Sequence, residues 1–249
     1  CDLVNDQTLD SYYDQCSMDG KVGFRGTFWN NRESEGKPVA ITYEKNPIQV
    51  TTYGQHSFAP NVKLVGFSAK YETVFRPKQT NKVLLDVAAC GHYEVYLNGE
   101  KKAEKSDWRT NESRIEFEAV NGKEYRIEIR YAEMPNYNAD MKINIGHETP
   151  IDYTASIQKL KDCETVVFVG GIAPQLEGEE MPINIPGFKG GDRTDIELPK
   201  VQRGFLQALK KAGKKVIFVN CSGSAIALAP ETESCDAILQ AWYPGQEGG

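Results

Sequence analysis

The sequence predicts a mixed fold in which a β-sandwich or barrel is combined with part of an α/β sandwich that has a mainly parallel sheet. Two observations support this prediction. From Val22 to about Ile145, short runs alternate apolar and polar residues, and alternation with a period of two is typical of half-buried strands. From about Ser156, nearly continuous apolar runs such as TVVFVGG flank a helical pattern, as expected for parallel strands that are covered on both faces.

The 249-residue chain is long enough for two domains that each bury a core. We predict a lead-in segment of the α/β domain over residues 1–21, a β-sandwich over residues 22–147 and a partial α/β domain over residues 148–249. The predicted parallel sheet has only three strands, and the last of them runs straight into the end of the chain. We therefore interpret the sequence as an excerpt from a longer protein.

Eight alternating runs make up the predicted β half. In chain order they are VGFRGTFW, VAITYE, KLVGFSAKYETVF, KVLLDVAA, YEVYLNG, RIEFEAV, KEYRIEIRY and MKINI. Asn98-Gly99 and Asn121-Gly122 are strong hairpin signals, because both residues of such a pair tolerate a positive φ. Many short strands at this spacing indicate a sandwich or a barrel.

The second half contains one clear helix, in LPKVQRGFLQALKKAG. Pro199 precedes its first turn, and Gly213 follows as a stop signal. Its apolar positions recur at helical spacing, and they are Val201, Phe205, Leu209 and Ala212. Because the runs TVVFVGG, KKVIFVNCSG and CDAILQAWYPG alternate with helical segments, we predict right-handed crossovers in a parallel sheet.

A long acidic loop, Gly170–Pro199, joins the first of these strands to the helix. Such connections usually have about 2–6 residues, and this one is several times longer. It carries Glu177, Glu179 and Glu180 within four positions. Because the loop leaves the carboxyl end of a parallel strand, where ligands bind in open α/β sheets, we predict a functional site there. A solvated surface loop is the alternative interpretation.

Composition and charge argue against several classes of protein. A net charge of -6 and a pI near 5.3 disfavour nucleic acid as a partner, because phosphate contacts need clustered Lys and Arg. No apolar run approaches the ~20 residues of a membrane span. The sequence also shows no signal peptide, because it lacks a positively charged start followed by an apolar stretch. The sequence has no CxxC pair, no histidines at metal-ligand spacing and no GxGxxG motif, so we predict neither a metal nor a cofactor.

The six cysteines are widely scattered along the chain. Cys221 and Cys235 lie in apolar contexts, so we predict buried free thiols at both positions. Cys1 and Cys16 are able to pair, and the sequence leaves this disulfide and the redox compartment open.

Motifs in both halves resemble known families. VVFVGG, LEGEEM, GGDRTDIELP, LKKAGKKVIFVN, SGSAIAL and AWYPGQEGG occur in this order between Val166 and Gly249. This part resembles the C-terminal α/β sandwich domain of glycoside hydrolase family 3, the β-glucosidases and β-xylosidases. The β half resembles the protective-antigen β-sandwich that is often inserted into that domain, through GFRGTFWNN, PIQV, FSAKYETVFRPKQTNKVLLDVAACGHYEVYLNGEKK and EYRIEIRY.

The resemblance implies part of a retaining exo-acting β-glycosidase that hydrolyses terminal β-linked sugars of oligosaccharides or aryl β-glycosides. In such enzymes an Asp on a separate (β/α)8 barrel attacks the anomeric carbon, and a Glu protonates the leaving oxygen. The family's loops carry Gly-Glu-Gly ahead of Asp-Arg, which makes Glu179 the acid/base, Glu180 the second choice and Glu177 the third. Glu180 replaces the second Gly of that pattern, and the insertion MPINIPGFKG separates it from Asp-Arg. The nucleophile and the N-terminal barrel would lie outside this chain, so we expect the isolated chain to be inactive. The resemblance also implies an enzyme that is periplasmic or secreted.

Three further motifs carry expectations. Arg193 of the pair Asp192-Arg193 is suited to a charge-assisted bond that fixes the loop, although an exposed pair is the alternative. Trp242 stands at a strand end, where it either stacks on a sugar or packs against the missing barrel. Ser106-Asp107-Trp108 matches the triplet around the family's nucleophile, but no apolar run precedes it. We therefore expect a turn there and reject Asp107 as the nucleophile.

Two alternatives to the glycosidase remain. A non-catalytic carbohydrate-binding or adhesion module is one, but Ala89-Cys90-Gly91 stands where sugar-binding relatives of the β-sandwich hold calcium with an Asp-Asp pair. A role in shaping the substrate pocket is therefore favoured for the sandwich. A nucleotide-binding α/β protein is the other alternative, and the lack of a phosphate-binding glycine motif argues against it.

Overall fold

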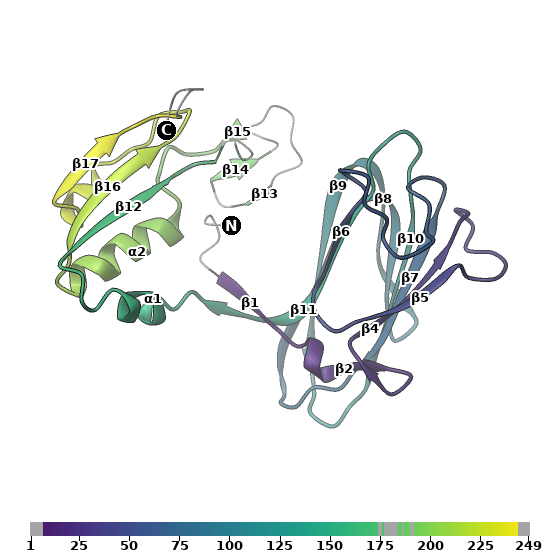
Figure 1. The fold of residues 1–249 in the computed structure, drawn as a ribbon. Helices are drawn as coiled ribbons and strands as arrows, with labels where there is room; N and C mark the ends of the chain where they lie inside the picture. Colours follow the sequence, from purple (N-terminus) through teal and green to yellow (C-terminus); the bar gives the residue numbers. More distant parts are fainter. Residues whose placement is uncertain (1–6, 174–175, 177–183, 186, 190–191, 244–249) are drawn as a thin grey trace. The chain divides into compact units, whose positions relative to one another are not determined.

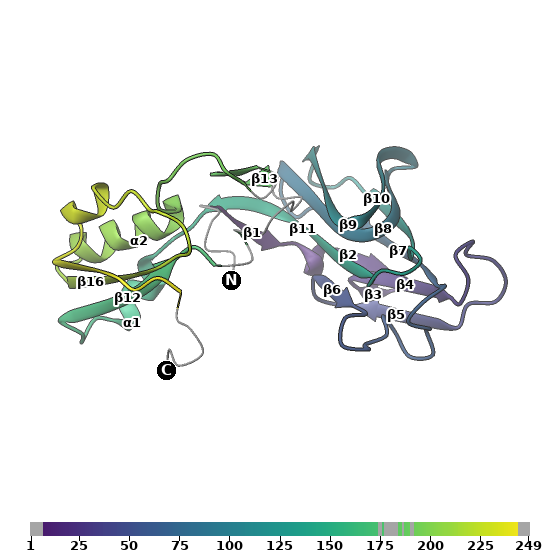
Figure 2. The ribbon, with the colours of Figure 1, turned by 90° about the horizontal axis from the view of Figure 1, so that it is seen from above.

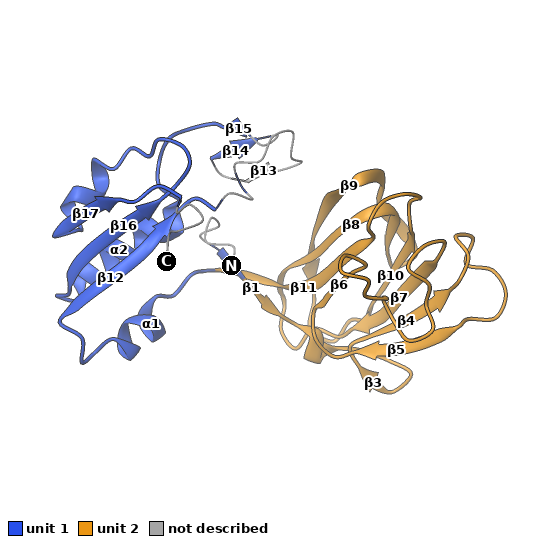
Figure 3. Cartoon of the chain, turned by 45° about the horizontal axis from the view of Figure 1, so that its top comes forward, with its two compact units in different colours: residues 1–8, 150–249 blue, residues 9–149 orange. Residues whose placement is uncertain are grey.

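The computed structural model of the protein describes residues 7–173, 176, 184–185, 187–189 and 192–243. The chain forms two compact units, which we call the β unit and the α/β unit (Figure 3). The β unit is Leu9–Thr149, and the α/β unit contains residues 150–249 together with the start of the chain up to Thr8. Most of the regular structure in the described residues is β.

Within the described residues, eleven strands form one curled sheet, and every pairing whose register is determined in it is antiparallel (Figure 1). The predicted sandwich or barrel is therefore a single curled sheet. Its order is β1-β11-β8-β10-β7-β2-β3, with β4 beside β7, β5 beside β4, β6 beside β11 and β9 beside β8. The strands are β1 (Gln7–Ser11), β2 (Cys16–Met18), β3 (Lys21–Val22), β4 (Phe24–Trp29), β5 (Ala40–Glu44), β6 (Ile48–Thr51), β7 (Ser68–Phe75), β8 (Asn81–Leu97), β9 (Glu100–Ala119), β10 (Tyr125–Ala132) and β11 (Asp140–Pro150).

Alternating burial builds the core of the β unit, as the period-two pattern predicts. Along β7 and β10, buried side chains alternate with partly exposed or exposed ones. Aromatic rings dominate the interior, and the largest fully buried ones are Tyr71, Tyr93, Tyr131, Phe24, Phe28, Phe67 and Phe75. Such rings bury a large apolar area each, so a core of this kind contributes strongly to the stability of the unit.

The two predicted hairpin turns have different outcomes. Asn98 and Gly99 both adopt positive φ, 53° and 82°, and join the paired strands β8 and β9, which confirms the first turn. Asn121-Gly122 joins β9 to β10, and in the described residues these strands pair with β8 and not with each other. The second hairpin prediction is therefore wrong, because β8 lies between the two strands that this turn connects.

Two of the predicted strand breaks are absent. KVLLDVAA and YEVYLNG belong to the single 17-residue strand β8, and Ser106-Asp107-Trp108 lies inside the 20-residue strand β9 instead of in a turn. Most side chains of β9 are exposed, so its sequence shows little of the apolar alternation by which a strand is recognised. Pairing with β8, interrupted by an irregularity around Cys90, holds β9 extended.

The β unit begins at Leu9, whereas we predict a lead-in over residues 1–21. Tyr13 explains the difference, because its ring is buried in the core and its hydroxyl donates to the Ile143 carbonyl at 2.9 Å. Tyr13 lies in a short 3-10 helix, Tyr13–Gln15, which has no periodic signal in the sequence. At the other end the β unit closes at Thr149, two residues after the predicted boundary at 147.

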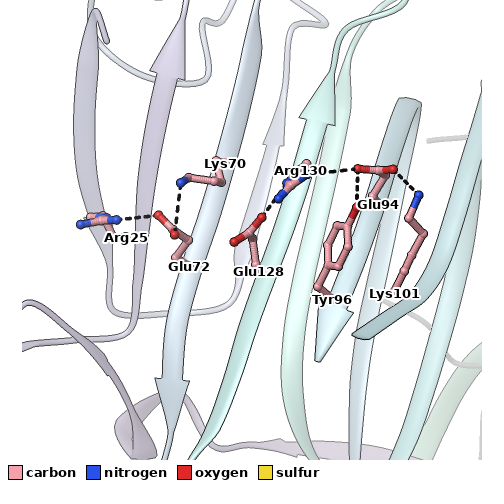
Figure 4. A network of polar contacts seen from close by, with 8 residues as sticks. All are labelled: Arg25, Lys70, Glu72, Glu94, Tyr96, Lys101, Glu128 and Arg130. Atoms are coloured by element: carbon pink, nitrogen blue, oxygen red, sulfur yellow. Dashed lines mark hydrogen bonds and ion pairs between the residues drawn. The ribbon is translucent and has the colours of Figure 1, made fainter. Parts of the chain in front are cut away.

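Two groups of ion pairs lie side by side on five strands of the curled sheet (Figure 4). The Arg25 guanidinium lies 2.6 Å from the Glu72 carboxylate of the neighbouring strand. The Glu94 carboxylate lies 2.5 Å from the Lys101 ammonium and 3.9 Å from the Arg130 guanidinium. Opposite charges directly across a strand pair contribute about 0.2–1 kcal/mol each. The residues drawn are Arg25, Lys70, Glu72, Glu94, Tyr96, Lys101, Glu128 and Arg130. This charged face keeps the outer side of the sheet solvated.

One carboxyl group of the β unit titrates near neutral pH. Burial, followed by a hydrogen bond with Glu112 and the charge of that group, raises the pKa of Asp86 on β8 to about 7. Arg114 opposes the shift, and Glu148, which pairs with Arg114, adds to it. Asn144 faces Asp86 from β11. A protonated Asp86 carboxyl avoids the repulsion that its charged form would meet beside Glu112.

We predict that Asp86→Asn changes the pH dependence of stability. The folded Asp86 carboxyl keeps its proton up to about pH 7, whereas the unfolded one loses it near pH ~4. Its contribution to the free energy of unfolding is therefore complete below about pH 4 and is lost as the pH rises to about 7. The melting temperature of the wild type should fall more between about pH 5 and 8 than that of the Asn variant. An equal dependence of the two melting temperatures on pH would contradict the raised pKa of Asp86.

The α/β unit has two small sheets and two α-helices in its described residues. β12 pairs in parallel with β16, and β16 pairs in parallel with β17, whereas β13, β14 and β15 form a short antiparallel meander. Among the described residues, the parallel strand pairs are those of this three-stranded sheet, and one isolated parallel bridge joins Glu197 to Ala227. The predicted mainly parallel sheet therefore accounts for a minor part of the fold. The elements are α1 (Thr154–Lys159), β12 (Thr165–Gly171), β13 (Asn184–Ile185), β14 (Phe188–Lys189), β15 (Asp192–Arg193), α2 (Lys200–Lys211), β16 (Lys215–Cys221) and β17 (Ala237–Gln240).

Helix α2 lies along one face of the parallel strands (Figure 2). It starts directly after Pro199, and the chain turns at Gly213 with a φ of +77°, as predicted. Leu206 and Leu209 are fully buried against β16. Ala212, expected in the apolar stripe, is exposed, and it directly follows Lys211, the last residue of the helix.

The opposite face of the parallel strands is open in the described residues. Val167, Val169 and Leu239 expose 58%, 63% and 59% of their surface. The sequence predicts cover on both faces, and the described part of the chain provides cover only on the side of α2.

Candidate functional site at the carboxyl edge of the parallel strands

The loop with the predicted acid starts at Gly171, the last residue of β12. Gly171 has a φ of +124°, and a Cβ atom there would lie 1.9 Å from the Cys221 carbonyl oxygen, so no other residue fits. The Gln202 amide of α2 accepts from the Gly171 N–H at 2.8 Å and donates to its carbonyl at 2.7 Å. Two hydrogen bonds from a buried side chain thus hold the end of the strand.

The predicted acid residues Glu177, Glu179 and Glu180 lie outside the described residues. The nearest described residues are Leu176 before them and Asn184 after them. Leu176 packs in a small apolar cluster with Ile172 and Phe188, both of which are almost fully buried. Apolar contacts therefore hold the chain before and after the acidic segment at the same edge of the sheet.

Arg193 secures the far side of the loop. Its guanidinium donates to Ser224 Oγ at 3.1 Å and to the carbonyls of Ala225 and Glu197, both at 3.0 Å. We expected a carboxylate partner, and the hydrogen-bond partners in the described residues are neutral oxygens. Asp192 beside it is exposed. Arg193 thus joins β15 to the segment that follows β16.

A buried polar network, which sequence reasoning missed, lies beneath this edge. Asn220 has no exposed surface, and its amide donates to Gln240 Oε1 at 2.6 Å and to Ser222 Oγ at 3.2 Å. Ser222 Oγ in turn donates to the Ser224 carbonyl at 2.9 Å. The network joins β16 and β17 to the segment that holds Arg193. Its sequence signal is a polar residue that ends the apolar run VIFV.

Trp242 and Tyr243 leave the same edge after β17. The Trp242 indole is 51% exposed on a backbone with a φ of +60°, and the Tyr243 hydroxyl donates to the Ile172 carbonyl at 2.8 Å. The start of the acidic loop and the end of the third strand are thereby joined. Both predicted roles of Trp242, sugar stacking and packing against another domain, stay open.

Three possible metal ligands of the β unit come together, although we predict no metal site. Atoms of His92, Glu94 and Glu104 lie within 4.8 Å of one another. The Lys101 ammonium, however, lies 2.5 Å from the Glu94 carboxylate and 2.8 Å from that of Glu104. Because a lysine supplies the positive charge between these carboxylates, the cluster is an ion-pair network.

Asp107 and the cysteines are the remaining residues that the sequence analysis singles out. Asp107 lies on β9 of the β unit, where the Arg109 backbone N–H holds the pKa of its carboxyl below the usual range. Cys16 is a buried free thiol, and burial raises its pKa to about 12, while Cys1 lies outside the described residues. Cys221 and Cys235 are free, as predicted, and they are half-buried instead of fully buried.

Comparison with known families shows to which family the chain belongs. The model of the glycosyl hydrolase family 3 C-terminal domain matches residues 35–249. The chain belongs to glycoside hydrolase family 3. The match extends from residue 35, within the β unit, to the end of the α/β unit, so it includes most of both units.

Individual family 3 relatives agree with this assignment. The whole chain is 55% identical, over 251 residues, to a xylan 1,4-beta-xylosidase of Xylanibacter ruminicola and spans 29% of that protein's length. A periplasmic beta-glucosidase of Salmonella typhimurium is 34% identical over 94 residues, which are 38% of this chain and 11% of that protein. The crystal structure of a beta-glucosidase from Kluyveromyces marxianus shares the fold, with a TM-score of 0.53 at 19% identity over 97% of this chain and 30% of that one. Among the described residues, no helix has the length and apolar character needed to cross a membrane.

Proposed function

We propose that this chain contributes the acid/base loop and an accessory β unit to a retaining exo-acting β-glycosidase. The observation that carries the proposal is the attachment of the acidic loop at both ends. Gln202 and Tyr243 bind the backbone at Gly171 and Ile172, and Arg193 binds the segment after β16. A family 3 chain that anchors a carboxylate loop at the carboxyl edge of parallel strands is suited to place an acid over a substrate.

The proposed chemistry needs two carboxyl groups. An Asp on a (β/α)8 barrel outside this chain attacks the anomeric carbon, while Glu179 donates a proton to the departing oxygen and later removes one from water. Such an acid must stay protonated near neutral pH, which a neighbouring carboxylate favours, and Glu177 and Glu180 are its neighbours in sequence. Glu180 is the second choice for the acid. Arg193 positions the loop.

A terminal β-linked xylose is the first substrate to test, because the 55% identical relative is named a xylan 1,4-beta-xylosidase. A β-glucoside is the second, since other relatives are named beta-glucosidases. Oligosaccharides and aryl β-glycosides are thus the substrate class that we propose, with Trp242 and Asp192 near the sugar. We propose a protective-antigen-type role for the β unit in shaping the pocket. We also propose a periplasmic or secreted location, because one relative is named periplasmic.

The open face of the parallel sheet supports a larger assembly. Val167, Val169 and Leu239 form an exposed apolar surface, and parallel sheets are generally covered by helices on both faces. We propose that further chain of the same enzyme covers this face and completes the α/β sandwich. Leu239→Asp should then be tolerated in the 249-residue chain and should impair folding of the longer enzyme.

The isolated chain should not hydrolyse p-nitrophenyl β-xyloside above the uncatalysed background, because the proposed nucleophile is not part of it. An enzyme that joins this chain to the barrel domain should be active on the same substrate. Release of nitrophenol is measured for both proteins at equal concentration. Turnover by the isolated chain that disappears in Asp107→Asn would overturn the proposal and would make Asp107 the nucleophile.

A further inference from the structure

An arginine of helix α2 bridges two glutamates at the far end of the acidic loop. The Arg203 Nε donates to the Glu231 carboxylate at 2.6 Å, and a terminal nitrogen of the same guanidinium lies 2.5 Å from the Glu197 carboxylate. Glu197 stands two residues before Pro199, where the loop ends, and Glu231 belongs to a short 3-10 helix, Pro230–Glu233. A planar guanidinium carries donors on more than one edge, so one arginine binds both carboxylates at once.

The two glutamates differ in burial. The Glu231 side chain has no exposed surface, whereas 47% of the Glu197 side chain is exposed. One Glu231 oxygen accepts from Arg203, and the other has no hydrogen-bond partner in the described residues. Because a buried carboxylate that loses its cation is strongly destabilising, Glu231 keeps Arg203 in place. Arg203 is thus a fixed point to which the more exposed Glu197 is attached.

Glu197 transmits this support to the loop through its backbone. Its carbonyl accepts from the Arg193 guanidinium at 3.0 Å. Arg193 belongs to β15, which pairs with β14, and Phe188 of β14 packs in the apolar cluster with Leu176 and Ile172. Contacts therefore run from α2 through Glu197 and Arg193 to the described residues before and after the acidic segment.

Neighbouring residues of α2 hold the two ends of the loop. Gln202 binds the backbone of Gly171, where the loop starts, and Arg203 binds Glu197 near its end. The bond between Arg203 and Glu197 adds little to stability, because a half-exposed carboxylate exchanges its partner for water at little cost. Its main effect is geometric, since it fixes the end of the loop relative to the helix that also fixes its start.

We propose that Arg203 and Glu197 position the acid/base of the enzyme to which this chain belongs, and that Glu231 orients Arg203. This inference rests on the proposed function, because it requires the loop to carry the acid. The two residues act through the loop and not on the substrate. A misplacement of about 1 Å can reduce a rate by ~10²-fold, so a loop end released from α2 should slow proton transfer to the departing sugar.

The test is Glu197→Ala in an enzyme that joins this chain to the barrel domain. This variant leaves Arg203 paired with Glu231, so it should melt close to the wild-type temperature. We would measure kcat/KM for xylobiose, whose departing sugar needs a proton, and for a dinitrophenyl β-xyloside, whose leaving group needs none. The ratio of the two values is independent of the fraction of folded enzyme. It should fall by about 10- to 100-fold.

Glu164→Ala is the matched control. Glu164 forms a comparable exposed pair with Lys215 at 2.8 Å, but at the amino ends of β12 and β16, so the ratio should stay at the wild-type value. Glu197→Gln keeps an oxygen that accepts from Arg203 and should retain most of the ratio. Arg203→Lys should lower the ratio as Glu197→Ala does, because a single ammonium stays with the buried Glu231 and releases Glu197.

Two outcomes would overturn the inference and leave the proposed function in place. One is a wild-type ratio in folded Glu197→Ala while a variant of the acidic loop, such as Glu179→Ala, lowers it. The other is an equal fall of the ratio in Glu197→Ala and Glu164→Ala. A ratio that Glu177→Ala, Glu179→Ala and Glu180→Ala all leave unchanged would overturn the proposed function itself, and this inference with it.

Discussion

Replacing Glu179 with alanine in an enzyme that joins this chain to the barrel domain should reduce the hydrolysis of xylobiose by about 10²–10⁴-fold. General acid catalysis contributes a factor of this size, because the departing sugar oxygen must be protonated in the transition state. Substrates with poor leaving groups should lose the most. The measurement is kcat/KM for xylobiose in the wild type and the variant.

A dinitrophenyl β-xyloside separates the two roles of the residue. Its leaving group departs without a proton, so Glu179→Ala should still form the covalent intermediate quickly and then accumulate it, because the same side chain activates water in the second step. Azide needs no base. It should restore turnover and yield a glycosyl azide of retained configuration.

The neighbouring glutamates are the matched controls for this experiment. Azide rescue of Glu180→Ala, with Glu179→Ala behaving as the wild type, would move the acid by one position. If Glu177→Ala, Glu179→Ala and Glu180→Ala all keep wild-type rates, the acidic loop has no catalytic role and the acid lies elsewhere.

Glu133→Ala should lower the free energy of unfolding of the β unit by about 2–4 kcal/mol. The Glu133 side chain has no exposed surface, and its carboxylate accepts from Arg32 at 2.8 Å and from the Gly66 N–H at 2.8 Å. These contacts connect three loops of the unit. Alanine removes the charged hydrogen bonds and leaves the Gly66 N–H without its partner, and both effects destabilise the folded state.

Glu124→Ala is the matched control. Glu124 also lies 2.8 Å from an arginine, Arg76, but 56% of its side chain is exposed. An exposed pair contributes about 0–1 kcal/mol, so this variant should unfold close to the wild type. Equal losses for Glu133→Ala and Glu124→Ala would show that burial does not decide the strength of these ion pairs.

Arg32→Ala should cost at least as much as Glu133→Ala. It leaves a fully buried carboxylate without its cation, whereas Glu133→Ala leaves a guanidinium that is 39% exposed and can bind water. Urea denaturation in a Trp242→Phe background would measure both, because the remaining tryptophans, Trp29 and Trp108, lie in the β unit.

The local sequence pattern was sufficient to predict most strands of the β unit, helix α2 with its ends at Pro199 and Gly213, and the place of the acidic loop after β12. These features depend on residues that are close in sequence. Period-two or helical alternation decides which side of an element is buried, and a glycine or a proline decides where the element stops. The family motifs are equally local, so they too could be read before the fold was known.

The predictions that failed concern contacts between distant residues. The turn at Asn121-Gly122 joins strands that do not pair, and β9 is held extended by β8 although its own pattern is largely polar. Tyr13 enters a core built by strands far along the chain. The partners of Arg193, which are Ser224 and the carbonyls of Ala225 and Glu197, are equally beyond what the local sequence can predict. A polar side chain takes whichever partner the assembled fold offers.

The Arg32–Glu133 pair shows the physical reason, since its members are 101 positions apart. Nothing in the local sequence distinguishes this pair from an exposed one such as Arg76–Glu124. Their different burial arises when strands are ordered in the sheet and loops close over its ends, and strand order depends on the packing of the whole core. Periodicity therefore predicted the elements and the position of the acidic loop, whereas tertiary packing selected the partners of each polar group.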